Sequence, residues 1–77
     1  MKLTISKIDK ILFSGEAESV TVPGAAGEMT ILAHHMPLIT TLKQGNLLVK
    51  HSEGKQEKLP ITSGIVEIGK TETVILV

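Results

Sequence analysis

The chain has 77 residues and a mass of 8.2 kDa, which is enough for one small domain over residues 1–77 and too little for a two-domain enzyme. Eight lysines balance one aspartate and seven glutamates, so the chain has no net field that would attract nucleic acid. The absence of cysteine excludes disulfides, thiolate zinc sites and cysteine nucleophiles. Because Phe13 is the only aromatic residue, ring-based binding of single-stranded nucleic acid or sugars is also disfavoured.

The local pattern favours β-strands throughout. Ile, Val and Thr contribute nine, six and eight residues, and these branched side chains suit pleated surfaces better than helices. Short alternating runs are separated by Gly and Pro at turn-like intervals, and no helical stripe is present. No apolar run approaches the roughly 20 residues of a membrane span, so a soluble protein is expected. The predicted strands, in chain order, are 2–6, 10–13, 16–22, 28–32, 38–42, 46–51, 56–61, 64–68 and 73–77.

This strand pattern predicts an all-β protein with about ten short strands in a flattened two-sheet sandwich or barrel. Two polar turns, 52–55 and 69–72, separate alternating runs and are predicted to close hairpins. Pro60 cannot donate a ladder hydrogen bond, so its strand should lie at an edge or contain a bulge.

The sequence offers no convincing metal site or catalytic group. His34 and His35 are adjacent, so in an extended segment they point to opposite faces, and surface or interface roles are expected for them and for His51. Ser63 or Ser14 could be combined on paper with a histidine and Asp9, but Ser63 lacks the strand-turn-helix context of a nucleophile elbow. The glycine-containing loops at 23–27 and 63–64 precede no helix and do not resemble phosphate-binding loops. The chain is therefore expected to be no enzyme and to bind no cofactor.

Two loops contain residues with either a structural role or a contact with another protein. Glu28 follows a Gly-rich loop and opens an apolar run, where its carboxylate could accept hydrogen bonds from loop amides or meet a partner. The segment 33–39 places Met36, Pro37 and aliphatic residues around two histidines, which suggests burial under the loop or a protein contact.

The order of these features resembles the N-terminal domain of the epsilon subunit of F-type ATP synthases. That family has a V-P-G turn, a G-E pair, an I-L pair, a histidine and a P-L-hydrophobic-T segment, and this chain has them in the same order between Val22 and Thr40. The flanks around Phe13 and from Ser63 to Leu76 also resemble the family, so the resemblance covers essentially the whole chain. The chain departs from the family pattern at His34 and at Ser63, where a small residue and a glycine are usual.

The resemblance implies a ten-stranded β-sandwich that joins the gamma shaft to the membrane-embedded c-ring and performs no chemistry. It implies a monomer within the complex, on the cytoplasmic face of the bacterial inner membrane, which contacts the membrane only through the complex. Family members usually continue into C-terminal regulatory helices, which this sequence does not include. By position, the loop at Ala25, Ala26, Gly27 and Glu28 would face the c-ring, and Lys7, His35 and Thr40 would face gamma.

The alternative is a small stand-alone β-sandwich that acts as a binding or carrier module. A lipoyl-type or biotinyl-type carrier needs an attachment lysine at a hairpin tip, and Lys55 and Lys70 are the only suitable positions. Neither residue has the Met-Lys or Asp-Lys context that those carriers use.

Overall fold

The computed structural model describes residues 1–77 and contains nine strands and no helix. No helix with the length and apolar character of a membrane span is present. The strands are β1 (Lys2–Lys7), β2 (Lys10–Glu16), β3 (Ser19–Gly24), β4 (Gly27–Leu32), β5 (Leu38–Leu42), β6 (Gly45–Lys50), β7 (Gln56–Ile61), β8 (Gly64–Ile68) and β9 (Glu72–Leu76).

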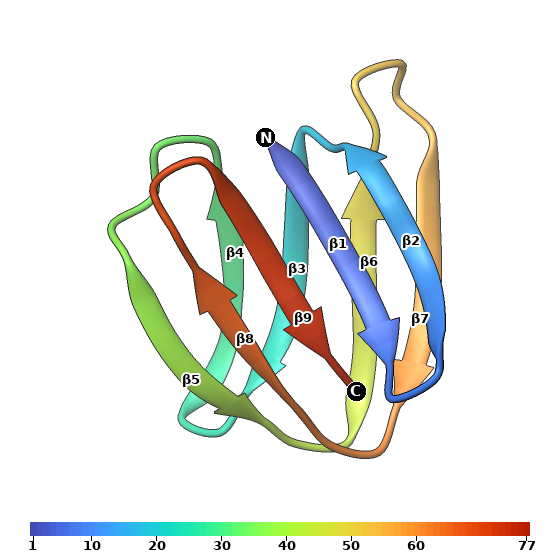
Figure 1. The fold of residues 1–77 in the computed structure, drawn as a ribbon, viewed down its shortest axis with the longest axis vertical. Helices are drawn as coiled ribbons and strands as arrows, with labels where there is room; N and C mark the ends of the chain where they lie inside the picture. The colour runs from blue at the N-terminus through green and yellow to red at the C-terminus, as the bar shows by residue number, and fades with distance from the viewer.

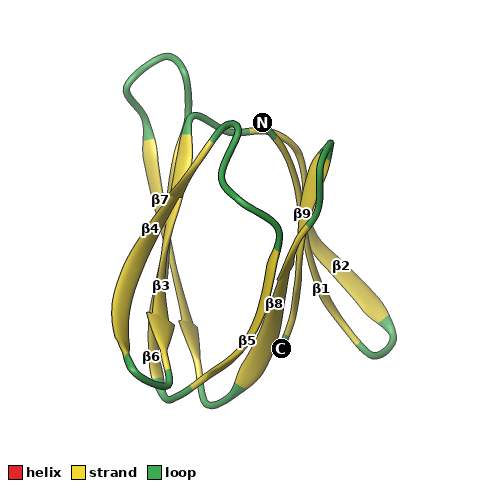
Figure 2. Cartoon of the chain, turned by 90° about the vertical axis from the view of Figure 1, so that its left-hand side faces the viewer, coloured by secondary structure: helices red, strands yellow, loops and turns green.

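One curled sheet folds over into two layers (Figures 1 and 2). The strand order is β2-β1-β9-β8-β5-β3-β6-β7, with β4 paired to the other side of β3. We call β2-β1-β9-β8-β5 layer I and β4-β3-β6-β7 layer II. All pairings are antiparallel except that of β1 with β9, which brings the two ends of the sequence side by side in parallel. The two-layer β-sandwich predicted from the sequence is thus confirmed, with nine strands where the resemblance implied ten.

The layers are joined at a corner between β3 and β5. The only β3–β5 ladder pair is Gly24 with Leu42, and two further backbone hydrogen bonds join Ala25 N to Thr41 O and Lys43 N to Pro23 O, both at 2.9 Å. A side chain at Gly24 would place its Cβ 2.7 Å from the carbonyl oxygen of Gly27, so this corner needs a residue without one.

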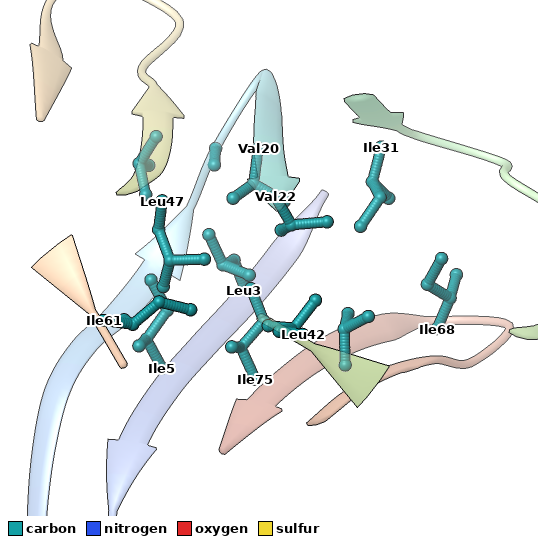
Figure 3. Packing of buried hydrophobic residues seen from close by; sticks show 13 residues of the cluster. Leu3, Ile5, Val20, Val22, Ile31, Leu42, Leu47, Ile61, Ile68 and Ile75 are labelled. Carbon is teal, nitrogen blue, oxygen red and sulfur yellow. The ribbon is translucent and has the colours of Figure 1, made fainter. Parts of the chain in front are cut away.

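The core lies between the two layers, and its buried hydrophobic residues are all aliphatic. Figure 3 shows side chains of layer I, such as Leu3, Ile5 and Ile75, meeting Val22 and Leu47 of layer II. No buried side-chain N or O atom lacks a hydrogen-bond partner, so the interior has no unsatisfied polar group. The buried hydrophobic residues are Leu3, Ile5, Ala17, Val20, Val22, Ile31, Leu42, Leu47, Val49, Ile61, Val66, Ile68 and Ile75.

The nine predicted strands are confirmed, with one-residue shifts at several ends and larger differences in the region 10–24. The structure extends the second strand to Glu16 and starts the third at Ser19, whereas the alternation predicted 10–13 and 16–22. The reason is that Ala17 is buried and donates its N–H to Met1 O, while the N–H of Glu18 bonds to Lys50 O, so these residues form the link between the layers. Both predicted hairpins are present, and Pro60 lies in β7, which is an edge strand.

Candidate interaction surfaces

The loops gather at two opposite ends of the sandwich (Figure 1). We call the lower end the one that carries the turns at 8–9, 25–26, 43–44 and 62–63 together with the C-terminus. The upper end carries the N-terminus and the loops at 17–18, 33–37, 51–55 and 69–71. Each residue singled out from the sequence can be placed relative to these ends.

The β3–β4 hairpin places its turn at the lower end. Its strands pair from Ser19–Leu32 down to Gly24–Gly27, which leaves Ala25 and Ala26 as an exposed two-residue turn. Gly27 has φ 141°, a conformation that L side chains rarely adopt, so glycine is required there. Because Ala25 also bonds to β5, the turn is held from outside its own hairpin and projects as a fixed feature.

Glu28 stands directly beside this turn with an unpaired charge. It is exposed on the outer face of β4, opposite Pro23. The ion pairs of the chain join the N-terminus to Glu16, Lys50 to Glu18 and His51 to Glu57, so none involves Glu28. A charge that is exposed and has no internal partner on a fixed hairpin is accessible to an external partner.

The two adjacent histidines lie at the upper end, in the loop from β4 to β5. His34 is the only non-glycine residue with positive φ, at 66°, which explains why a small residue suits this position better than a branched one. His35 is half-buried, and its Nδ1 lies 2.8 Å from the carbonyl oxygen of Met36. No group of three or more His, Cys, Asp or Glu side chains is placed to hold a metal ion.

The third histidine, His51, joins an edge strand of layer I to an edge strand of layer II. The rings of His51 and Phe13 lie 5.4 Å apart at an angle of 57°, and His51 Nε2 lies 2.8 Å from Glu57 Oε2. Phe13 belongs to β2 and Glu57 to β7, which are the two terminal strands of the sheet. His51 therefore has a structural role, and it lies at the end opposite to the turns that carry Asp9 and Ser63, so no triad forms with either.

The three residues assigned to a gamma contact do not form one cluster. Lys7 ends β1 at the lower end, whereas His35 lies at the upper end. Thr40 lies between them on β5, and its side chain points inward, because it pairs with buried Val66. Any one partner that reaches all three must extend along the full length of layer I.

The structure adds a feature that the sequence reasoning missed, an apolar outer face on layer I. One row of outward-facing residues runs across the sheet as Thr41, Ile65, Leu76, Ser6 and Ile11, each paired with the next in register. Ile11 is 64% exposed, Leu76 52% and Ile65 44%, values that are high for large aliphatic side chains gathered on one face. The sequence contained a signal for this face, because the runs 65–68 and 74–76 have apolar residues at both odd and even positions. Both faces of these strands therefore carry apolar side chains.

Comparison with known proteins agrees with this architecture. The family model for the ATP synthase delta/epsilon chain β-sandwich domain matches residues 1–77. The ATP synthase epsilon chain of Dichelobacter nodosus is 41% identical over 68 residues, which are 88% of this chain and 48% of that protein. The epsilon chain of Mesorhizobium japonicum is 40% identical over 67 residues, 87% of this chain and 50% of its own length. The chain thus spans about half the length of these curated relatives.

Two solved structures share the fold. A chain of the mitochondrial ATP synthase of Euglena gracilis (OSCP, F1 and c-ring) superposes with a TM-score of 0.90 at 26% identity, covering 96% of this chain and 48% of that one. A chain of the central stalk and c-ring structure of the Tetrahymena thermophila mitochondrial ATP synthase has a TM-score of 0.84 at 14% identity, with 97% and 60% covered.

Proposed function

Because the chain belongs to the family of ATP synthase delta/epsilon β-sandwich domains, we propose that it is a non-catalytic part of the central stalk of a rotary ATP synthase. In this role residues 1–77 act as one β-sandwich domain that couples the gamma shaft to the c-ring at the cytoplasmic face of a bacterial inner membrane. The observation that carries the proposal is the match of the family model to every residue of the chain. The domain needs no cofactor for this role, because a coupling joint requires stiffness and contact area rather than chemistry.

The lower end supplies the proposed contact to the c-ring. The turn at Ala25 and Ala26 is exposed, Gly27 fixes its geometry, and Glu28 presents a carboxylate without an internal partner. Polar loops of a ring could donate charge-assisted hydrogen bonds to that carboxylate. The bond from Ala25 N to Thr41 O supports this role, because it ties the turn to β5.

The outer face of layer I supplies the proposed contact to gamma. A partner that touches Lys7 at one end and His35 at the other must cover the face between them, where Ile65 and Leu76 are exposed. Thr40 is half-buried on β5, the terminal strand of layer I beside the corner, so the partner would reach it over the edge of the layer. Apolar contact area with a few charged residues at its margins is the usual composition of a protein interface.

The test is co-purification of the chain with the gamma subunit encoded by the same genome. The wild-type chain is expected to form a one-to-one complex in size-exclusion chromatography, and His35→Glu is expected to weaken it. Glu28→Lys should leave that complex intact and weaken binding to a gamma and c-ring assembly, because Glu28 is assigned to the ring. The proposed function would be overturned if the folded wild-type chain did not bind a folded gamma subunit.

A further inference from the structure

The turn between β1 and β2 carries a large aliphatic side chain that does not pack in the core. Lys7 pairs with Lys10, so Ile8 and Asp9 form a two-residue turn at the lower end. Neither residue has a positive φ, so this turn does not require Gly, Asn or Asp and accepts most side chains. Ile8 is a large aliphatic side chain that is fully exposed to solvent. It contributes nothing to the core and is available for a contact outside the chain.

The two lysines beside Ile8 have no ion-pair partner within the chain. Lys7 and Lys10 stand directly opposite each other on paired strands, and like charges in this arrangement repel. Neither lysine takes part in an ion pair, not even with Asp9 between them. The turn therefore presents one ammonium group on each side of an apolar side chain. Neither ammonium group has a negatively charged partner within the chain.

The turn is continuous with the apolar outer face of layer I. Ile8 and Leu76 line one shallow hollow together with Ser6, Lys7 and Val77. Ile11, which follows the turn on β2, faces outward across Ser6 from Leu76. A partner seated on the outer face thus meets Ile8 at its lower margin.

We propose that Ile8 is an anchor that inserts into an apolar pocket on the shaft partner, and that carboxylates of the partner border this pocket and pair with Lys7 and Lys10. This inference rests on the proposed function and adds the chemistry of the partner's surface to it. Buried aliphatic anchors surrounded by charge pairs at the rim are a common arrangement of binding energy in interfaces.

Two other occupants fit the turn less well. A second copy of the chain docked through the same turn would bring four lysines together, which opposes association. A membrane surface needs more than this turn offers, because stable attachment of a peripheral protein takes a long acyl chain or a large apolar face in addition to basic residues. A protein pocket with acidic borders satisfies both the apolar side chain and the two charges.

The experiment measures binding of the 77-residue chain to the cognate gamma subunit by calorimetry. Ile8→Ser is expected to raise the Kd by about tenfold to hundredfold, as loss of one buried aliphatic side chain implies. The double variant Lys7→Gln/Lys10→Gln is expected to weaken binding at low salt and to reduce its dependence on salt concentration. The matched controls are Leu32→Ser, an exposed aliphatic on the outer face of layer II, and Lys58→Gln on the same layer, and both should bind like wild type.

The outcomes separate the two levels of the proposal. If wild type binds gamma and Ile8→Ser binds equally well while remaining folded in a thermal melt, the anchor is wrong and the proposed function stands. If wild type does not bind at all, the proposed function fails and the anchor fails with it. Vesicles containing anionic phosphatidylglycerol should not retain the chain. If they retain wild type and Ile8→Ser abolishes the retention, Ile8 contacts lipid and the proposal of a protein pocket is wrong.

Discussion

The two layers bury the same kind of side chain and differ on the faces they turn outward. The outer face of layer I carries Ile11, Ile65 and Leu76 in one row. The corresponding row of layer II runs through Thr30, Thr21, Leu48 and Lys58, and it includes a hydrogen bond of 2.9 Å between the two threonine hydroxyls. Leu32 is also exposed on the outer face of layer II, but it is not part of such a row, and this difference supports layer I as the partner face in the proposed function.

The largest expected effect comes from placing a charge on the apolar face. Leu76→Glu should weaken binding of the proposed gamma partner by at least about hundredfold, because the interface would then bury an unpaired carboxylate. Thr30→Glu, which is exposed on the outer face of layer II, should leave binding unchanged. Both variants are measured by calorimetry against the same partner. Equal losses of affinity in the two variants would show that the outer faces of layers I and II do not differ in gamma binding.

The next effect concerns the corner that separates the two faces. Gly24→Ala should lower the free energy of unfolding by about 1–3 kcal/mol, because its Cβ would meet the carbonyl oxygen of Gly27 at 2.7 Å and the backbone must shift. Gly15→Ala is the control, since there the nearest atom, in the Phe13 ring, is 3.9 Å away. Denaturant unfolding of both variants checks this expectation. A Gly24→Ala protein as stable as wild type would show that the corner can relax.

A smaller effect of opposite sign is expected in the loop that connects the layers at the upper end. His34→Gly should raise the free energy of unfolding by about 0.5–1 kcal/mol, because glycine adopts φ 66° without the steric cost that a side chain carries. His35→Gly, at a position with negative φ, should not stabilise the protein. The comparison of the two melting curves decides whether the positive φ of His34 is a cost to stability.

The smallest effect is expected on the outer face of layer II. Thr21→Val and Thr30→Val should each change stability by less than about 0.5 kcal/mol, and a double-mutant cycle should give a coupling below about 1 kcal/mol. Gamma binding should be unaffected by either change. A large coupling would mean that this face has a structural demand of its own, and the contrast with layer I would need another explanation.

The strands and their turns could be predicted from the sequence because the signals are local. Alternation at positions such as 3–5 and 20–22 sets which side chains share a face, and the Gly54 turn and Pro60 mark a hairpin and an edge. The boundary near Ala17 was less predictable, because that residue is fixed by contacts with Met1 and the core rather than by its neighbours.

The chain by itself determined the β-class, the positions of the strands along the sequence, the aliphatic core and the family pattern from Val22 to Thr40. Only the tertiary structure decided that β1 lies parallel to β9, that Gly24 and Leu42 join the layers, and that Ile65 and Leu76 face solvent. It also separated Lys7 from His35 and turned Thr40 inward. The physical reason is that local periodicity gives a strand two faces, while the pairing of distant strands decides which of them is buried.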